Sequence, residues 1–170
     1  MSLIIWMTGL QCSGKTTIAR KLSNHIPNLA VLDGDEMRDW LSTNEDFSQD
    51  GIKNHNKKVS KLVKLLLEHM VPVCVSKINP YAEDRKDIRK MLSNYNFIEV
   101  YVKCSVDICE KRDVRGMYKK ARNDKIENFL GINGVYEPPT DPELIVDTEN
   151  STIEQSVEAI LHYLSVKKMI

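Results

Sequence analysis

The residues best suited to chemistry lie near the start of the chain, where a glycine-rich stretch is followed by a lysine and a hydroxyl. The stretch from Gly9 to Thr16 matches the phosphate-binding pattern Gly-x-x-x-x-Gly-Lys-Thr without a mismatch. The glycines let backbone N–H groups converge on one anion, the lysine adds a point charge, and the threonine hydroxyl can bind Mg²⁺. A structural glycine-rich turn is the alternative. The preferred interpretation is a nucleoside triphosphate site, with Mg²⁺ on Thr16 and phosphate contacts from Gly9, Cys12, Ser13, Gly14, Lys15, Thr16 and Thr17.

A second chemical feature is the acidic pair Asp33 and Asp35, which directly follows the apolar run at residues 29–32. Ligands of open parallel sheets bind beyond the carboxyl ends of the strands, which is where these acids would lie. A turn accounts for Gly34 between them but does not require two carboxylates. We therefore expect at least one of the two acids to act on a ligand.

The elements that must position these residues follow from the apolar patterning. Apolar runs predict strands at residues 3–7, 29–32, 71–76, 97–102 and 144–147. Helices are predicted at residues 17–22, 36–41, 59–67, 82–92, 106–113 and 153–164, with a polar loop at 42–51. Strands that alternate with helices form a parallel sheet covered on both faces. We therefore predict a doubly wound α/β fold in one domain spanning residues 1–170, with a five-stranded parallel sheet flanked by helices.

A basic segment at residues 114–122 contains Gly116, which could serve as a hinge. Such a segment is typical of a small mobile lid that closes over phosphates, and we place this lid at approximately residues 114–134. A solvated basic helix is the alternative interpretation.

Charge and cysteine content narrow the class of partner. The chain has 24 Lys and Arg residues and 24 Asp and Glu residues, so its net charge indicates neither nucleic acid nor a membrane as partner. No apolar run reaches membrane-spanning length, and the chain starts directly in its first strand, so we expect a cytoplasmic protein. The four cysteines form no paired Cys-x-x-Cys, so zinc is not expected. Cys74 and Cys104 are predicted core residues, while Cys12 is either a tolerated small side chain or a redox site.

Two classes of phosphate-loop protein are considered: a nucleotide switch that hydrolyses GTP, and a kinase that passes the γ-phosphate to a small molecule. A GTPase would need a guanine-reading Asn-Lys-x-Asp, which does not occur in the sequence. A motor ATPase would usually carry an acid at the end of the third strand, whereas that strand ends in Ser76 and Lys77. The acids follow the second strand instead, beside the place where an acceptor hydroxyl could lie. This arrangement favours a kinase that phosphorylates a small molecule.

The chain resembles adenylylsulfate (APS) kinase along almost its whole length. The matching stretches are Gly9 to Thr16, Leu32 to Asp35 with Arg38, Phe47-Ser48, Ile78 with Pro80, Phe97 to Tyr101, Tyr118 to Arg122, Gly131-Ile132 and Val135 to Pro138. The resemblance implies a P-loop kinase-type fold and transfer of the γ-phosphate of ATP, with Mg²⁺, to the ribose 3′-hydroxyl of a nucleotide. It also implies that the chain can form a homodimer.

The same resemblance assigns roles to individual residues. Asp35 would orient the hydroxyl or accept its proton, with Asp33 and Lys15 assisting. Arg38 would bind the acceptor phosphate, and Arg112 would stack on the adenine of ATP. Phe47 and Phe129 would sandwich the acceptor base. The lid would contribute Lys119, Lys120 and Arg122.

The departures from the family pattern lie at the acceptor side. Where the family has an Asp-Arg pair and then an Asn, this chain has Gly51, Ile52 and His55. The family's Ile-Ser-Pro is Ile78-Asn79-Pro80, preceded by Lys77 in place of an apolar or small residue. An isoleucine cannot replace a guanidinium that binds an anion. The predicted acceptor-binding residues are Arg38, Phe47, Ile52, His55, Lys77, Ile78, Asn79, Pro80 and Phe129.

We therefore expect the reaction type to be kept and the acceptor to have changed. One branch that resembles this family phosphorylates cytidine diphosphoramidate for capsule polysaccharide decoration, and this nucleotide is the leading candidate. Adenylylsulfate itself, in sulfate activation, is the alternative. A non-catalytic nucleotide-binding protein is a third hypothesis.

Overall fold

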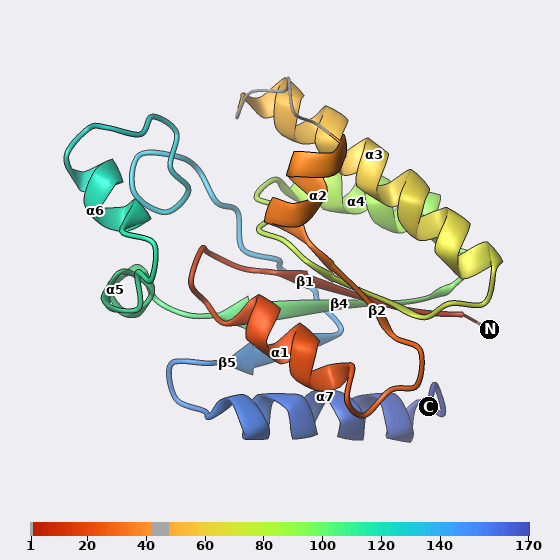
Figure 1. Cartoon of the computed structure of the whole chain (residues 1–170). Coiled ribbons are helices and arrows are strands. Elements are labelled where there is room, and N and C mark those ends of the chain that lie inside the picture. Colours follow the sequence, from red (N-terminus) through yellow and green to blue (C-terminus); the bar gives the residue numbers. More distant parts are fainter. Residues whose placement is uncertain (1, 42–47) are drawn as a thin grey trace.

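A five-stranded parallel sheet forms the centre of the protein (Figure 1). The computed structural model describes residues 2–41 and 48–170. The strands are β1 (Leu3–Thr8), β2 (Ala30–Asp33), β3 (Val73–Ser76), β4 (Asn96–Lys103) and β5 (Leu144–Asp147). They lie in the order β2-β3-β1-β4-β5, and all four neighbouring pairs are parallel. The predicted α/β fold is thus confirmed.

Helices cover both faces of the sheet (Figure 1). On one face lie α1 (Lys15–Leu22) and α7 (Ile153–Val166). On the other lie α2 (Gly34–Leu41), α3 (Gln49–Glu68) and α4 (Ala82–Met91). Two short helices, α5 (Val106–Lys111) and α6 (Met117–Arg122), lie beyond the ends of the strands. None of the helices in the described parts of the chain is long and apolar enough to cross a membrane.

The phosphate-binding loop directly follows the central strand β1. All six of its residues are buried, because successive side chains point to opposite faces and both faces are covered. Ile5 packs in the core under α1 and α7, while Trp6 packs with the α3 residue Val63 in the core on the other face. The loop that follows β1 therefore emerges from a fully buried strand at the centre of the sheet.

Helix α3 differs from the sequence prediction. The predicted helix started at residue 59 and the loop ran to 51, but α3 begins at Gln49, after Ser48 caps it by accepting a hydrogen bond from the Gly51 N–H (3.1 Å). The polar residues His55 and Asn56 lie on the buried face of α3 and so interrupt the apolar period. The loop prediction for residues 49–51 is therefore wrong.

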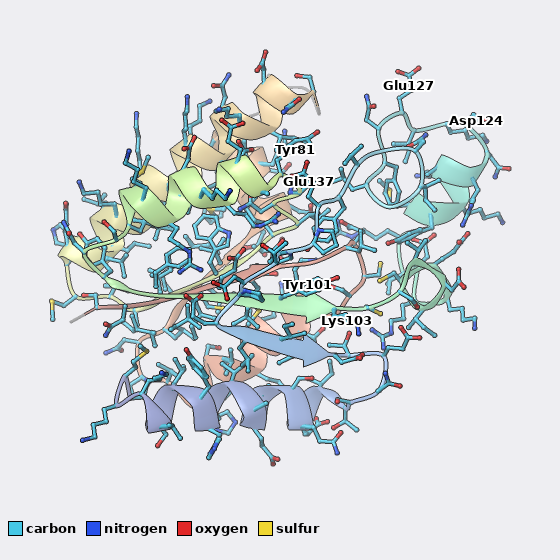
Figure 2. All side chains as sticks on the ribbon, turned by 180° about the vertical axis from the view of Figure 1, so that it is seen from behind. Tyr81, Tyr101, Lys103, Asp124, Glu127 and Glu137 are labelled. Atoms are coloured by element: carbon cyan, nitrogen blue, oxygen red, sulfur yellow. The ribbon has the colours of Figure 1, made fainter. Side chains whose placement is uncertain are left out.

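The predicted lid segment, residues 114–134, lies beside the ends of β1 and β4 (Figure 1). Gly116 adopts a φ of +65° at the start of α6, and a Cβ added to it would meet no atom within 4 Å. Figure 2 shows Asp124 and Glu127 on the outer edge of this segment, and both are exposed. Tyr118 anchors the segment to the rest of the protein. Its ring is buried, and its hydroxyl donates a hydrogen bond to the Gln11 carbonyl (3.0 Å). That the segment moves stays a prediction.

Candidate active site

A cavity of about 710 Å³ opens where the loops after β1, β2 and β3 meet. The carboxyl ends of parallel strands share one edge of the sheet, so loops distant in sequence converge there. The cavity brings together most of the predicted site residues, namely Cys12, Gly14, Lys15, Thr16, Thr17, Asp33, Asp35, Arg38, Ile52, His55, Lys77, Ile78, Asn79, Pro80 and Arg112.

The phosphate-binding loop needs its glycines for steric reasons. A Cβ on Gly9 would lie 2.4 Å from the Val102 carbonyl oxygen, which belongs to the neighbouring strand β4. Gly14 has a φ of +100°, a conformation that side chains rarely adopt, and it directly precedes α1. The loop therefore turns tightly from strand to helix and directs backbone N–H groups and the helix N-terminus toward the cavity.

Lys15 lies inside this loop rather than in solvent. Its Nζ donates hydrogen bonds to the carbonyls of Gly9 (2.9 Å) and Leu10 (2.6 Å) and to Ser13 Oγ (3.3 Å). Burial lowers the pKa of Lys15 to about 8, and the nearby Asp33 carboxylate opposes part of that shift. The loop thus holds one cation where phosphate oxygens would be bound.

Asp33 is fixed beside the loop. Its Oδ2 accepts a hydrogen bond from Thr16 Oγ1 (2.6 Å), and Thr16 Oγ1 also lies 3.1 Å from Ser76 Oγ at the end of β3. The other oxygen, Oδ1, accepts from the backbone N–H of Asp35 (3.0 Å). Hydroxyls and one carboxylate are hard oxygen ligands, which suit Mg²⁺ bound together with nucleotide phosphates. The described residues hold no cluster of three or more His, Cys, Asp or Glu that could bind a metal by itself.

Asp35 is the more accessible acid. It lies in the first turn of α2, and its side chain is 58% exposed. Its Oδ2 lies 2.8 Å from Nη1 of Arg115, which comes from the segment between α5 and α6. Arg115 is not among the site residues predicted from the sequence, although it belongs to the basic stretch at residues 114–122. Asp35 therefore faces the cavity with a cation of the predicted lid beside it.

The far end of the cavity holds the predicted acceptor residues. Arg38 comes from α2, Ile52 and His55 come from α3, and Lys77 follows β3. Ile52 and Lys77 are only 6% and 9% exposed. Among the described residues that line the cavity, the acids are Asp33 and Asp35, whereas the predicted acceptor residues there are cationic, polar or apolar.

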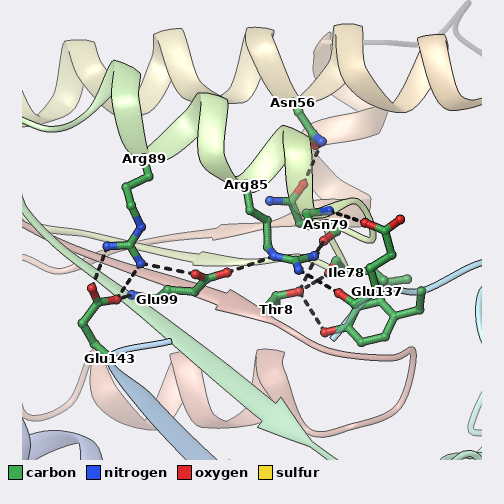
Figure 3. A network of polar contacts seen from close by, with 11 residues as sticks. Thr8, Asn56, Ile78, Asn79, Arg85, Arg89, Glu99, Glu137 and Glu143 are labelled. Carbon is green, nitrogen blue, oxygen red and sulfur yellow. Dashed lines mark hydrogen bonds and ion pairs between the residues drawn. The ribbon is translucent and has the colours of Figure 1, made fainter. Parts of the chain in front are cut away.

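The loop after β3 is held through its backbone (Figure 3). Thr8 Oγ1 donates to the Ile78 carbonyl (2.5 Å), and Arg85 Nη1 donates to the Asn79 carbonyl (2.9 Å). Arg85 Nε in turn forms a buried ion pair with Glu99 on β4 (3.0 Å). The backbone of the acceptor side is thus fixed to two strands and to α4.

Glu99 also belongs to a wider ion-pair network (Figure 3). Arg89 on α4 lies 3.2 Å from Glu99 and binds both oxygens of Glu143 (2.6 and 2.8 Å). The Arg89 hydrogen bond helps to hold the pKa of Glu143 below its ordinary value, against the opposing effect of burial. This network connects α4 to β4 and to the loop before β5.

Arg112 lines the cavity, and its Nη2 donates a hydrogen bond to the Thr148 carbonyl (2.6 Å). Thr148 also lines the cavity and donates to the Ser13 carbonyl (2.8 Å). Thr148 is not among the site residues predicted from the sequence, because its position after β5 belongs to no motif.

Several predicted residues do not line the cavity. Phe129 packs edge-on against Tyr118, with ring centroids 4.9 Å apart, while its neighbour Leu130 borders the cavity. The Arg122 guanidinium forms an ion pair with Glu110 (2.9 Å). Two further predicted lid residues, Lys119 and Lys120, are exposed on α6. Phe47, the other predicted stacking ring, lies outside the described residues.

A phosphate-binding loop, an acidic pair and a cationic far end, placed on a parallel sheet of this order, define the class of P-loop kinases. The family model of adenylylsulphate kinase matches residues 1–147. The chain belongs to this family, as the sequence resemblance predicted.

Individual relatives agree. The adenylyl-sulfate kinases of Oceanobacillus iheyensis and Staphylococcus epidermidis are each 42% identical to this chain over 173 residues, covering 99% of this chain and 87% of each relative. Among solved structures, Mycobacterium tuberculosis APS kinase CysC, in complex with AMPPNP and APS, superposes with a TM-score of 0.91 at 30% identity. That match covers 96% of this chain and 98% of the other.

Proposed function

We propose that this kinase transfers the γ-phosphate of ATP to the ribose 3′-hydroxyl of a nucleotide, and that adenylylsulfate is the acceptor favoured by its relatives. One observation carries the proposal: a single cavity is lined by the phosphate-binding loop, by the acids Asp33 and Asp35 and by most of the predicted acceptor residues. Phosphoryl transfer depends mainly on positioning and charge neutralisation, which this arrangement supplies.

The proposed phosphoryl transfer assigns a role to each of these groups. The acceptor oxygen forms a bond to the γ-phosphorus, the bond from that phosphorus to the bridging oxygen breaks, and ADP leaves. The hydroxyl proton passes to the carboxylate of Asp35, which is the accessible acid. Lys15 holds the phosphates from the loop side. Mg²⁺, bound with ATP through Thr16 and Asp33, would supply further neutralisation of phosphate charge.

Arg115 has a place in this proposal because its guanidinium lies beside Asp35. A guanidinium there adds positive charge on the side of the cavity where the phosphoryl group crosses to the acceptor.

Cytidine diphosphoramidate is the second candidate acceptor. The departures of the sequence from the family pattern favour this acceptor. The relatives named adenylyl-sulfate kinase favour APS instead, and none of the comparisons supports a role in capsule biosynthesis. The observation in its favour is Ile52, whose apolar side chain forms part of the buried cavity wall where the family pattern has an arginine. A neutral phosphoramidate would need fewer cationic contacts than a phosphosulfate.

The test is an ATP-consumption assay with APS and cytidine diphosphoramidate as separate acceptors, with the phosphorylated position mapped by phosphorus NMR. Turnover of APS with phosphate on the 3′-oxygen supports the primary proposal. Turnover of the cytidine compound with little on APS replaces APS by the second candidate. Binding of both nucleotides without transfer refutes catalysis and returns the non-catalytic hypothesis.

A further inference from the structure

Residues 135–138, which we call the post-lid segment, directly follow the predicted lid and have the sequence Val-Tyr-Glu-Pro. None of these four residues lines the main cavity. Glu137 nevertheless binds the backbone and the helix that follow β3. Its N–H donates to the Pro80 carbonyl (2.9 Å), and its own carbonyl accepts from Arg85 Nη2 (2.7 Å; Figure 3). The post-lid segment is therefore fixed to the loop that forms the acceptor side of the cavity.

The side chain of Glu137 caps helix α4 from 55 positions away in the sequence. Its Oε2 accepts a hydrogen bond from the backbone N–H of Ala82 (2.7 Å), the first residue of α4. The first N–H groups of a helix have no partner within the helix, and Tyr81, which precedes α4, supplies no side-chain cap. A carboxylate is also favoured at this end of the helix dipole. Glu137 thus supplies the cap that usually comes from the preceding residue.

Two neighbouring contacts connect the same segment to both sides of the cavity. Arg85 is 6% exposed, and its guanidinium binds the carbonyls of Glu137 and of Asn79, a residue that lines the cavity. The hydroxyl of Tyr136 lies 3.1 Å from Oγ1 of Thr8, the last residue of β1 before the phosphate-binding loop. The end of the predicted lid is therefore attached to the acceptor loop and to the strand that carries the phosphates' loop.

The predicted lid also reaches the catalytic acids. Near its start, Arg115 lies 2.8 Å from Asp35. Near its end, the Asn133 side chain accepts from the Phe129 N–H (2.6 Å) and donates to the Ile126 carbonyl (3.0 Å), which closes the last loop of the lid on itself. Because of these internal bonds, we expect this loop to follow the position of the post-lid segment as one unit.

We propose that Glu137 is a positioning residue for phosphoryl transfer, because it fixes the end of the predicted lid to the helix that follows the acceptor loop. Arg115 and the acceptor loop must both be in place around the transferred phosphate, and a misplacement of about 1 Å can cost about 100-fold in rate. Glu137 acts through α4 and the lid rather than on the substrate. The inference rests on the proposed function for the reaction, but the attachment itself can be measured without it.

The first test is steady-state kinetics with the acceptor that the wild type phosphorylates. Glu137→Ala should lower kcat/KM for the acceptor about 10-fold, which is the order that a hydrogen bond to a charged group contributes. The dissociation constant of ATP, measured by calorimetry without acceptor, should stay within about 2-fold of the wild-type value. Glu137→Gln keeps an acceptor oxygen and should restore most of the loss. Glu127→Ala removes an exposed carboxylate from the predicted lid (Figure 2) and, as the matched control, should behave as the wild type.

Ala82→Pro removes the donor of the same hydrogen bond. Proline is tolerated as the first residue of a helix, and Tyr81 before it already has the extended backbone that a following proline requires (φ −97°, ψ 131°). If Glu137 acts through this N–H, the double variant Glu137→Ala/Ala82→Pro should be no slower than the slower single variant. Independent effects would multiply to about 100-fold and would overturn the proposal. Thermal unfolding checks each variant, and if Ala82→Pro does not fold, the contrast between Gln and Ala at position 137 decides.

Hydrogen exchange of backbone amides separates a positioning role from a local cap, and it needs no kinase activity. In Glu137→Ala the amides of Ala82 and of Gly134, which donates to the Phe129 carbonyl (2.9 Å), should both exchange faster than in the wild type. Faster exchange confined to Ala82 would overturn the proposal, as would an unchanged kcat/KM for the acceptor. If the wild type phosphorylates no nucleotide, the proposed function fails, whereas faster exchange at both amides would still support the attachment of the lid through Glu137.

Discussion

The buried ammonium of Lys15 should destabilise the ligand-free protein in a pH-dependent manner. Burial lowers the pKa of Lys15 from its ordinary value of 10.5 to about 8. At about 1.4 kcal/mol per pKa unit, the folded protein disfavours the charged lysine by about 3 kcal/mol. Between pH 8 and 10.5 the unfolded chain binds the proton and the folded protein does not, so stability rises with pH in this window. The penalty is complete below this window and is lost above it.

The assay is urea unfolding of wild type and Lys15→Met, without nucleotide, at pH 7, 9 and 10.5. The quantity compared is the free energy of unfolding of the wild type minus that of Lys15→Met, because the difference cancels the other titrating groups. We expect it to increase by about 3 kcal/mol from the lowest to the highest pH. Lys61→Met removes an exposed ammonium instead, and its difference from wild type should stay within about 0.5 kcal/mol.

A difference between wild type and Lys15→Met that does not change with pH would refute the reasoning, because it would mean that the buried lysine carries no desolvation penalty. A second set of unfolding measurements, with Mg-ATP present, tests the role of Lys15 in nucleotide binding. Mg-ATP at about 100 times its dissociation constant should stabilise the wild type by about 2.7 kcal/mol. Lys15→Met should gain much less, since the phosphates would lose their loop cation.

Three further substitutions test the site and its support. Asp35→Asn should lower kcat by about 10²- to 10⁴-fold with little change in ATP affinity, and an unchanged kcat would exclude Asp35 as proton acceptor. Ile52→Arg should raise kcat/KM for APS about 10-fold in the ATP-consumption assay, and no gain would mean that the side chain at position 52 does not determine acceptor specificity. Glu99→Leu should lower the free energy of unfolding by about 3 kcal/mol, because Arg85 would keep a buried charge without its carboxylate. A loss in urea unfolding no larger than that of exposed Glu158→Leu would contradict this.

Much of the fold could be predicted because its signals are local. The fifth strand was predicted at residues 144–147, where β5 lies, and the last helix was predicted to start at Ile153. Its N-terminus is marked by a capping box between Thr152 and Gln155, which is a sequence-local signal. The start of α3 was missed because His55 and Asn56 occupy buried positions that an apolar period would have filled. His55 lines the cavity, and Asn56 donates hydrogen bonds to Asn79 and Asp84, so both positions carry polar side chains although they are buried.

Residues of the candidate site could be predicted only where they belong to a short sequence motif. The phosphate-binding loop and the acidic pair are short patterns, and the cavity contains both. The contact of Asp35 with Arg115 joins residues 80 positions apart, and that of Lys77 with Asn56 joins residues 21 apart. Nothing in the sequence around either pair specifies the partner, since only the packing of the loops brings them together. For the same reason, the contact of Phe129 with Tyr118 could not be predicted from local patterns.

The way the loop after β3 is anchored bears on how this family can acquire new acceptors. Thr8 and Arg85 hold the loop by the carbonyls of Ile78 and Asn79, and every amino acid supplies a carbonyl. A mutation at position 77 or 78 can therefore alter the chemistry of the cavity wall while the loop keeps its course, whereas Asn79 is also held by its side chain, which accepts a hydrogen bond from Asn56. Selection for a different acceptor can then act on single side chains such as Lys77, one mutational step at a time, without first rebuilding the scaffold that carries them.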